Sequence, residues 1–89
     1  MLRAQGHSMA PTIEDGDRML IDEADRKVGP RGGIYVIRLG GVLMVKRVTR
    51  PGRRLQISSD NPEFAPMPPH EAGAIEVLGR VVWLSRAIR

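Results

Sequence analysis

The stretch that decides the fold is IYVIRLGGVLMVKRVT, residues 34–49. Two runs rich in β-branched residues, Ile34–Leu39 and Val42–Thr49, flank the pair Gly40-Gly41. Two glycines in that position predict a tight hairpin, because both central residues of the favoured turn need a positive φ. The sequence therefore predicts an antiparallel pair of strands at the centre of the chain.

A two-residue loop also fixes the register of this hairpin. The pairs that follow are Leu39 with Val42, Ile37 with Met44 and Tyr35 with Lys46. Since side chains alternate across a strand, Lys46 lies on the more apolar face, while Arg38 and Arg47 lie on the other. Such a lysine has two explanations. Either its stem covers apolar surface while the ammonium reaches water, or burial lowers its pKa and makes a neutral amine available as a general base.

Short apolar runs bounded by turn residues predict further strands on both sides of the hairpin. These runs are Arg18–Asp22, Leu55–Ser58 and Ile75–Ser85, the last with a bulge or bend at Gly79. The segments between them are rich in Gly, Pro and charged residues, which predicts loops. No helix of normal length is predicted. The expected fold class is all-β, a small and strongly bent mixed or antiparallel sheet in one domain, residues 1–89.

Length and composition narrow the class of protein. The 89 residues, 42% of them hydrophobic, suffice for one modest core, and with only three aromatic residues we expect that core to consist of Val, Ile, Leu and Met. There is no cysteine, so no disulfide or thiolate metal site forms, and neither a cofactor nor a metal is predicted. No apolar run approaches the ~20 residues that span a bilayer. We therefore expect a cytoplasmic protein without a membrane partner.

The net charge of +4 comes from twelve arginines and two lysines. The arginines are dispersed, apart from a small cluster at Arg50, Arg53 and Arg54. Direct nucleic-acid binding favours a continuous basic stripe with aromatic residues for stacking, which this pattern lacks.

Residues 6–17, GHSMAPTIEDGD, carry the main candidate for chemistry. Pro11 prevents a helix from running through this segment, so Ser8 is expected on a short, stiff elbow. Serines in such segments commonly brace turns, and a serine becomes a nucleophile only when a base activates it. A neutral Lys46 within hydrogen-bond reach of Ser8 would form a Ser–Lys dyad.

Five blocks in order, SMAPTIEDGD, GGIYVIR, MVKRV, SSDNPEF and LGRVVW, resemble the C-terminal domain of LexA-like and phage CI-like repressors. These are Ser–Lys self-cleaving peptidases, a group that includes UmuD-type proteins. The resemblance covers Gly6 to Arg86 and implies the β fold of LexA and signal peptidases. It implies Ser8 as the nucleophile, Lys46 as the general base, and an oxyanion hole formed by the backbone amides of His7 and Ser8.

The resemblance also implies a biological role. The expected partners are a second copy in a homodimer and the RecA filament that stimulates cleavage in the SOS response. DNA would be contacted only through an N-terminal helix-turn-helix domain. The family's Ala-Gly or Cys-Gly cleavage bond lies several tens of residues before its serine, whereas Ser8 is the eighth residue here. We therefore expect a fragment of a longer protein that cannot cleave itself in cis.

Several alternatives stay open at this stage. The domain could be a non-catalytic dimerisation module that pairs through Val77–Leu84, with Trp83, as a C-terminal edge strand. It could be a fragment of a signal-peptidase-like protease, or a basic β-module that binds nucleic acid directly. His7 and His70 are expected as surface histidines, although a Ser8, His70 and Asp60 triad is formally possible.

Overall fold

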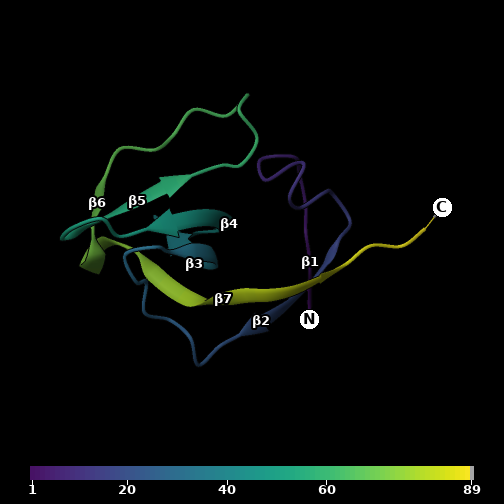
Figure 1. Cartoon of the computed structure of the whole chain (residues 1–89), viewed down its shortest axis with the longest axis horizontal. Coiled ribbons are helices and arrows are strands. Elements are labelled where there is room, and N and C mark those ends of the chain that lie inside the picture. The colour runs from purple at the N-terminus through teal and green to yellow at the C-terminus, as the bar shows by residue number, and fades with distance from the viewer. Residues whose placement is uncertain (89) are drawn as a thin grey trace.

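The computed structural model describes residues 1–88, which form one strongly curled sheet (Figure 1). Its strands are β1 (Leu2–Arg3), β2 (Arg18–Asp22), β3 (Gly33–Leu39), β4 (Val42–Thr49), β5 (Arg54–Ser58), β6 (His70–Glu71) and β7 (Glu76–Ser85). One turn of 3-10 helix, η1 (Ala72–Ala74), precedes β7. The order across the sheet is β1-β2-β7-β3-β4-β5-β6, and neighbouring strands are antiparallel. The all-β prediction is confirmed.

The central hairpin forms as its sequence predicts. Gly40 and Gly41 have φ values of +57° and +79°, and Leu39 pairs with Val42. Further along the hairpin Tyr35 faces Lys46, so the predicted register is confirmed. The other predicted strands also form within a residue of their expected bounds, whereas the two-residue strands β1 and β6 were not predicted.

Strand β7 lies inside the sheet, between β2 and β3. The expectation of a C-terminal edge strand at Val77–Leu84 is therefore wrong, because β7 pairs with β3 over its first half, up to Arg80, and with β2 from Arg80 to Ser85. An edge strand is defined by the long-range order of strands, which no local pattern reveals.

Two irregularities bend β7. The register against β3 shifts between Gly79 and Val77, which leaves Leu78 as an extra residue, and a second shift against β2 leaves Val82 extra. The predicted irregularity thus lies directly beside Gly79. A Cβ at Gly79 would be 2.6 Å from Ile21 Cγ2 and 2.8 Å from the Asp22 carbonyl oxygen. The missing side chain lets β2 pass close to β7.

Apolar residues form two clusters, on opposite faces of the hairpin. The first contains Tyr35, Ile37 and Val48 with residues of β5, and the second contains Met9, Ile13 and Met19 packed against Ile34 and Val45. Tyr35 is only 1% exposed, so the core is not purely aliphatic as expected, whereas Phe64 and Trp83 are exposed. The second cluster anchors the N-terminal segment that contains Ser8 to the sheet.

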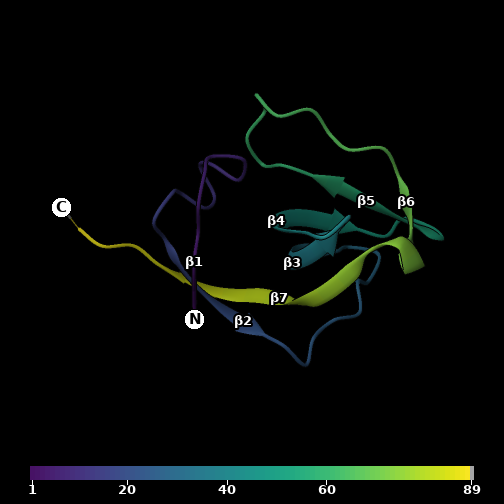
Figure 2. The ribbon, with the colours of Figure 1, turned by 180° about the vertical axis from the view of Figure 1, so that it is seen from behind.

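The C-terminal segment leaves the sheet beyond β7 and runs away from it (Figure 2). Near its start, Arg86 forms a bidentate pair with Asp17, at distances of 2.8 and 2.7 Å. No helix among residues 1–88 is long and apolar enough to cross a membrane.

Candidate active site

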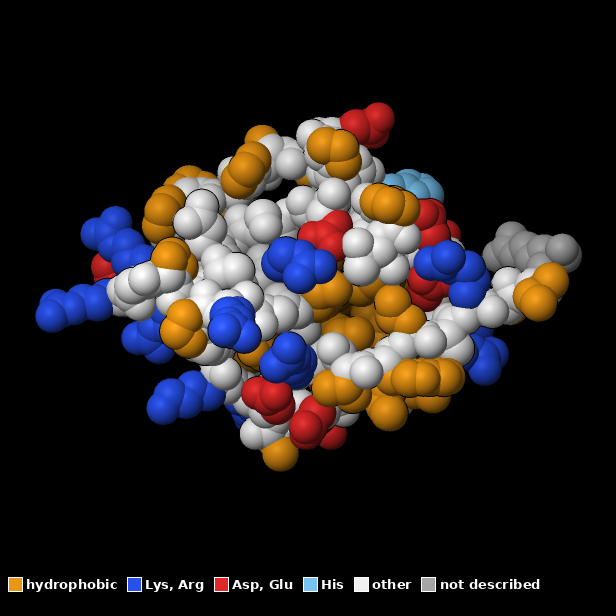
Figure 3. All heavy atoms as spheres, viewed as in Figure 1, with side chains coloured by type: hydrophobic (Ala, Val, Ile, Leu, Met, Phe, Trp, Pro, Cys, Tyr) orange, Lys and Arg blue, Asp and Glu red, His pale blue; other side chains and the backbone are white. Residues whose placement is uncertain are grey.

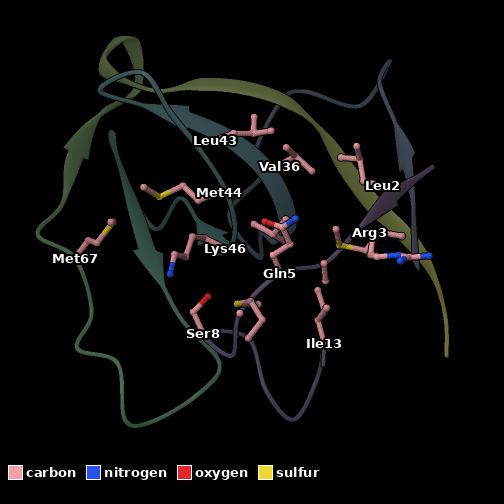
Figure 4. Close-up of a pocket in the computed structure, with 15 residues that line it drawn as sticks. Leu2, Arg3, Gln5, Ser8, Ile13, Val36, Leu43, Met44, Lys46 and Met67 are labelled. Carbon is pink, nitrogen blue, oxygen red and sulfur yellow. The ribbon is translucent and has the colours of Figure 1, made fainter. Parts of the chain in front are cut away.

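A pocket of about 460 Å³ opens between the N-terminal segment and the first half of β4 (Figure 4). Ser8 and Lys46 both line it, and their hydroxyl and amine ends point toward one another. Within residues 1–88, β4 pairs with β5 only from Arg47 to Thr49. The edge of Val42–Lys46 that faces away from β3 is therefore not covered by a strand, and the pocket lies along it.

Four methionines contribute to the pocket's apolar lining. Met9 and Met19 come from the N-terminal half, Met44 from β4, and Met67 from the loop before β6. Methionine side chains are flexible and adapt to irregular partners. The pocket can therefore accommodate apolar side chains of varied shape beside Ser8.

Consecutive turns place Ser8 at the pocket. The Ala10 N–H donates to the His7 carbonyl at 3.1 Å, and the Ile13 N–H donates to the Met9 carbonyl at 2.9 Å. Residues 6–13 therefore bend and turn, and no helix passes through Pro11. The prediction of an elbow that is not helical is confirmed.

Asn61 attaches this elbow to the loop that follows β5. Its side-chain Nδ2 donates to the His7 carbonyl at 2.9 Å, and its backbone N–H donates to the Ser8 carbonyl at 3.0 Å. Among the described residues, the N–H groups of His7 and Ser8 donate no hydrogen bond. Both donors are therefore free for a ligand, which is what an oxyanion hole requires. Their role in catalysis stays a prediction.

Lys46 is half-buried, and burial lowers the pKa of its ammonium below the ordinary value. Its Nζ donates a hydrogen bond to Ser59 Oγ at 2.8 Å and lies 5.8 Å from the centre of the Phe64 ring. The residue that this lysine contacts by a hydrogen bond is thus Ser59 rather than Ser8. Ser8 and Lys46 share the pocket, and their catalytic roles stay a prediction.

The structure does not bring together the alternative triad. Both carboxylate oxygens of Asp60 accept from Arg47, at 2.7 and 2.9 Å, and this hydrogen bonding lowers the pKa of Asp60. His70 lies in β6, opposite Leu55. His7 is exposed as expected, but His70 is half-buried, and its Nδ1 is buried without a partner among the described residues. The expectation of a surface histidine at position 70 is wrong, because an unpredicted strand holds it.

Asp17 stabilises the C-terminal end of residues 6–17, the segment that carries Ser8. Its side chain is buried, accepts two bonds from Arg86 and accepts the Glu14 N–H at 2.8 Å. The Arg86 hydrogen bonds are the main reason that the pKa of Asp17 falls to about 2, against the opposing effect of burial. Its backbone carbonyl accepts the Ala4 N–H at 2.7 Å. Both ends of the elbow are therefore fixed.

Sequence reasoning missed Ser59 and Asn61, which it treated only as turn residues. Their contacts depend on the register between β4 and β5, where Arg47 faces Ser58. That register is set by a connection, residues 50–53, whose length and geometry follow no standard two-residue turn. The sequence carried no signal for these contacts.

Comparison with known proteins adds independent evidence. The family described as Peptidase S24-like matches residues 1–82. An HTH-type transcriptional regulator of Haemophilus influenzae is 33% identical over 89 residues, which cover 96% of this chain and 36% of the relative. The protein ImpA of Salmonella typhimurium is 32% identical over 90 residues, 99% of this chain and 61% of that protein.

The LexA repressor of Ralstonia pickettii is 37% identical over 68 residues, which cover 75% of this chain and 31% of the repressor. The chain thus spans about a third of the length of the two regulators and less than two thirds of ImpA.

Proposed function

The chain belongs to the S24-like peptidase family, and from this premise we propose that it is the self-cleaving serine peptidase domain of a LexA-like or phage-type transcriptional repressor. One observation carries the catalytic part of the proposal: Ser8 and a half-buried Lys46 converge in one pocket (Figure 4). Two of the relatives described above are named as regulators of transcription, which favours a repressor over a signal peptidase.

In this proposal Ser8 is the nucleophile and Lys46 is the general base. The neutral amine of Lys46 accepts the Ser8 proton while Ser8 Oγ attacks the carbonyl carbon of the scissile peptide. The N–H groups of His7 and Ser8 stabilise the resulting oxyanion. The ammonium of Lys46 then donates its proton to the departing amine, and water hydrolyses the acyl-enzyme. Burial supports this role, since a lysine with an ordinary pKa is almost fully charged near neutral pH.

The uncovered edge of β4 is the proposed binding site for the peptide to be cleaved. An extended chain can add to a free strand edge through main-chain hydrogen bonds, with alternate side chains entering pockets. Along Val42–Lys46 such a chain would pass between Met44 and the N-terminal segment and reach Ser8. The apolar lining favours apolar side chains next to the scissile bond.

The biological role extends beyond this chain and follows from the resemblance. Cleavage between an N-terminal helix-turn-helix domain and this domain would inactivate a dimeric repressor in the SOS response, with a RecA filament as stimulator and the cytoplasm as location. Five arginines of the described residues form ion pairs with carboxylates of the same chain. This neutralisation disfavours direct binding of DNA by this domain.

Cleavage in trans tests the catalytic proposal. A peptide with an Ala-Gly bond, the bond expected in this family, is incubated with the wild-type chain at alkaline pH, where more of Lys46 is neutral. We expect cleavage by the wild type and its loss in Ser8→Ala and in Lys46→Ala. Equal rates in all three proteins would refute the assignment.

A specific surface feature favours dimerisation as a second function. Leu20 and Trp83 are cross-strand partners in β2 and β7, and with Val82 they are 45%, 53% and 51% exposed. Apolar side chains gather over these strands in Figure 3. Exposed apolar patches of this kind are typical of protein interfaces. Sedimentation velocity at micromolar concentration should show a dimer that Trp83→Ser weakens, and a monomer at all concentrations would remove this function.

A further inference from the structure

The hydrogen bond between Lys46 Nζ and Ser59 Oγ links strand β4 to the loop that follows the next strand, β5. Lys46 lies in β4, at the last position before the ladder with β5 begins, and Ser59 directly follows the end of β5. The bond therefore spans the point where the two strands separate and the pocket opens. Both side chains are half-buried.

The loop around Ser59 is held on both of its sides. Asp60 accepts two bonds from Arg47, the residue that follows Lys46. Asn61 then donates to the carbonyls of His7 and Ser8. Three consecutive residues thus connect the lysine strand to the serine elbow, and Ser59 is fixed in space relative to both.

This arrangement meets a geometric need of the lysine. A lysine side chain has a flexible four-carbon stem and a freely rotating amine, so it does not orient itself. General-base catalysis requires that the lone pair of the neutral amine point at the proton it removes. A hydrogen bond donated to a fixed hydroxyl occupies one N–H and thereby restricts the direction of the lone pair.

We propose that Ser59 is a positioning residue for the Lys46 amine, an inference that rests on the proposed Ser8–Lys46 peptidase. Ser59 Oγ accepts a hydrogen bond from Nζ both before and after the amine takes the Ser8 proton, so it exchanges no proton itself. Its hydroxyl holds Nζ in the pocket and prevents the amine from turning toward water. The nucleophile and its base then stay aligned throughout the reaction.

The test compares two substitutions of equal shape in the full chain. Ser59→Thr keeps the hydroxyl, whereas Ser59→Val replaces it with a methyl group, and Ser58→Ala is the control at the neighbouring position. The first readout is the 13C order parameter of Lys46 Cε, measured by NMR relaxation on protein with labelled lysine. We expect it to fall in Ser59→Val and to stay at the wild-type value in Ser59→Thr and Ser58→Ala.

The second readout is the pH profile of peptide cleavage in trans. A misdirected base lowers the alkaline plateau, where the amine is fully neutral, and we expect a loss of about 10- to 100-fold in Ser59→Val. Ser59→Thr should restore most of this loss. A Ser59→Val profile that shifts along the pH axis but reaches the wild-type plateau would overturn the proposal. In that case Ser59 would change the pKa of the Lys46 amine without orienting it.

The two readouts separate the proposals. If the order parameter falls in Ser59→Val while the wild-type chain cleaves nothing, the positioning contact stands and the peptidase assignment fails. If the wild-type chain cleaves in a Ser8-dependent manner while Ser59→Val matches it in both readouts, the peptidase stands and the role of Ser59 is refuted.

Discussion

Replacing Asp17 by asparagine should destabilise the fold in a pH-dependent manner. The carboxylate is 1% exposed, accepts two hydrogen bonds from Arg86 and accepts the Glu14 N–H. Asparagine resembles the protonated acid in shape and charge. The substitution therefore removes the advantage that the folded state gains from the ionised form.

The pKa of Asp17 gives the size of this effect. A fall from 3.8 to about 2 is a difference of roughly 1.8, which corresponds to about 2.4 kcal/mol at about 1.36 kcal/mol for each unit. Because the Arg86 side chain is 56% exposed, screening by solvent reduces the effect, and we expect about 1–2 kcal/mol. In a domain of this size, 1 kcal/mol lowers the melting temperature by roughly 4–8 °C.

The sign of the pH dependence follows from the lowered pKa. The contribution is fully present above pH 3.8 and is lost as the pH falls through the folded value of about 2. Urea denaturation of wild type and Asp17→Asn between pH 7 and pH 2.5 measures it. The two free energies of unfolding should differ most at pH 7 and approach one another as the pH falls toward 2.5.

The control is Glu71→Gln. Glu71 pairs with Arg54 on the surface, where the two side chains are 71% and 65% exposed. We expect a change below about 0.5 kcal/mol, since exposed ion pairs contribute little. A difference between wild type and Asp17→Asn that is absent at pH 7, or the same at every pH, would refute the reasoning.

Three further results are expected. The pH profile of the Ser8-dependent reaction should rise as Lys46 loses its proton, with a midpoint below 10.5, as measured by initial rates; a midpoint at or above 10.5 would contradict the lowered pKa. Ile57→Ala should lower the free energy of unfolding, measured by urea denaturation, by about 2–5 kcal/mol, because the Ile57 side chain is fully buried in the first cluster. A decrease below about 1 kcal/mol would contradict that packing. Gly79→Ala should lower the free energy of unfolding by about 1–3 kcal/mol, since its Cβ would meet the Asp22 backbone. In the control Gly33→Ala the Cβ would meet only the flexible Arg80 side chain, so the loss should be smaller. Equal melting temperatures of the two variants would contradict the close approach of β2 and β7.

The central hairpin could be predicted from the sequence in detail, because its determinants are local. Gly40-Gly41 specifies the turn, the turn specifies the register, and the alternation of side chains then places Lys46 opposite Tyr35. The other strands of normal length were also predicted, since each is a short apolar run between turn residues.

The long-range arrangement could not be predicted in this way. The insertion of β7 between β2 and β3 depends on pairing partners that lie up to 67 residues away, as Arg18 and Ser85 do, and it turned an expected edge into an inner strand. The same limit applies to the site. Residue type and resemblance singled out Ser8 and Lys46 as candidates, and both line one pocket, but the Ser59 and Asn61 contacts depend on the β4–β5 register.

The most direct test of the account is the identity of the activated serine. A fluorophosphonate probe reacts with a serine hydroxyl whose proton a nearby base removes, and peptide mapping by mass spectrometry locates the adduct. We predict one adduct per chain on Ser8 at alkaline pH, and its loss in Lys46→Ala. An adduct on Ser59, or labelling of Ser8 that is unchanged in Lys46→Ala, would contradict the pairing of this hydroxyl with this amine.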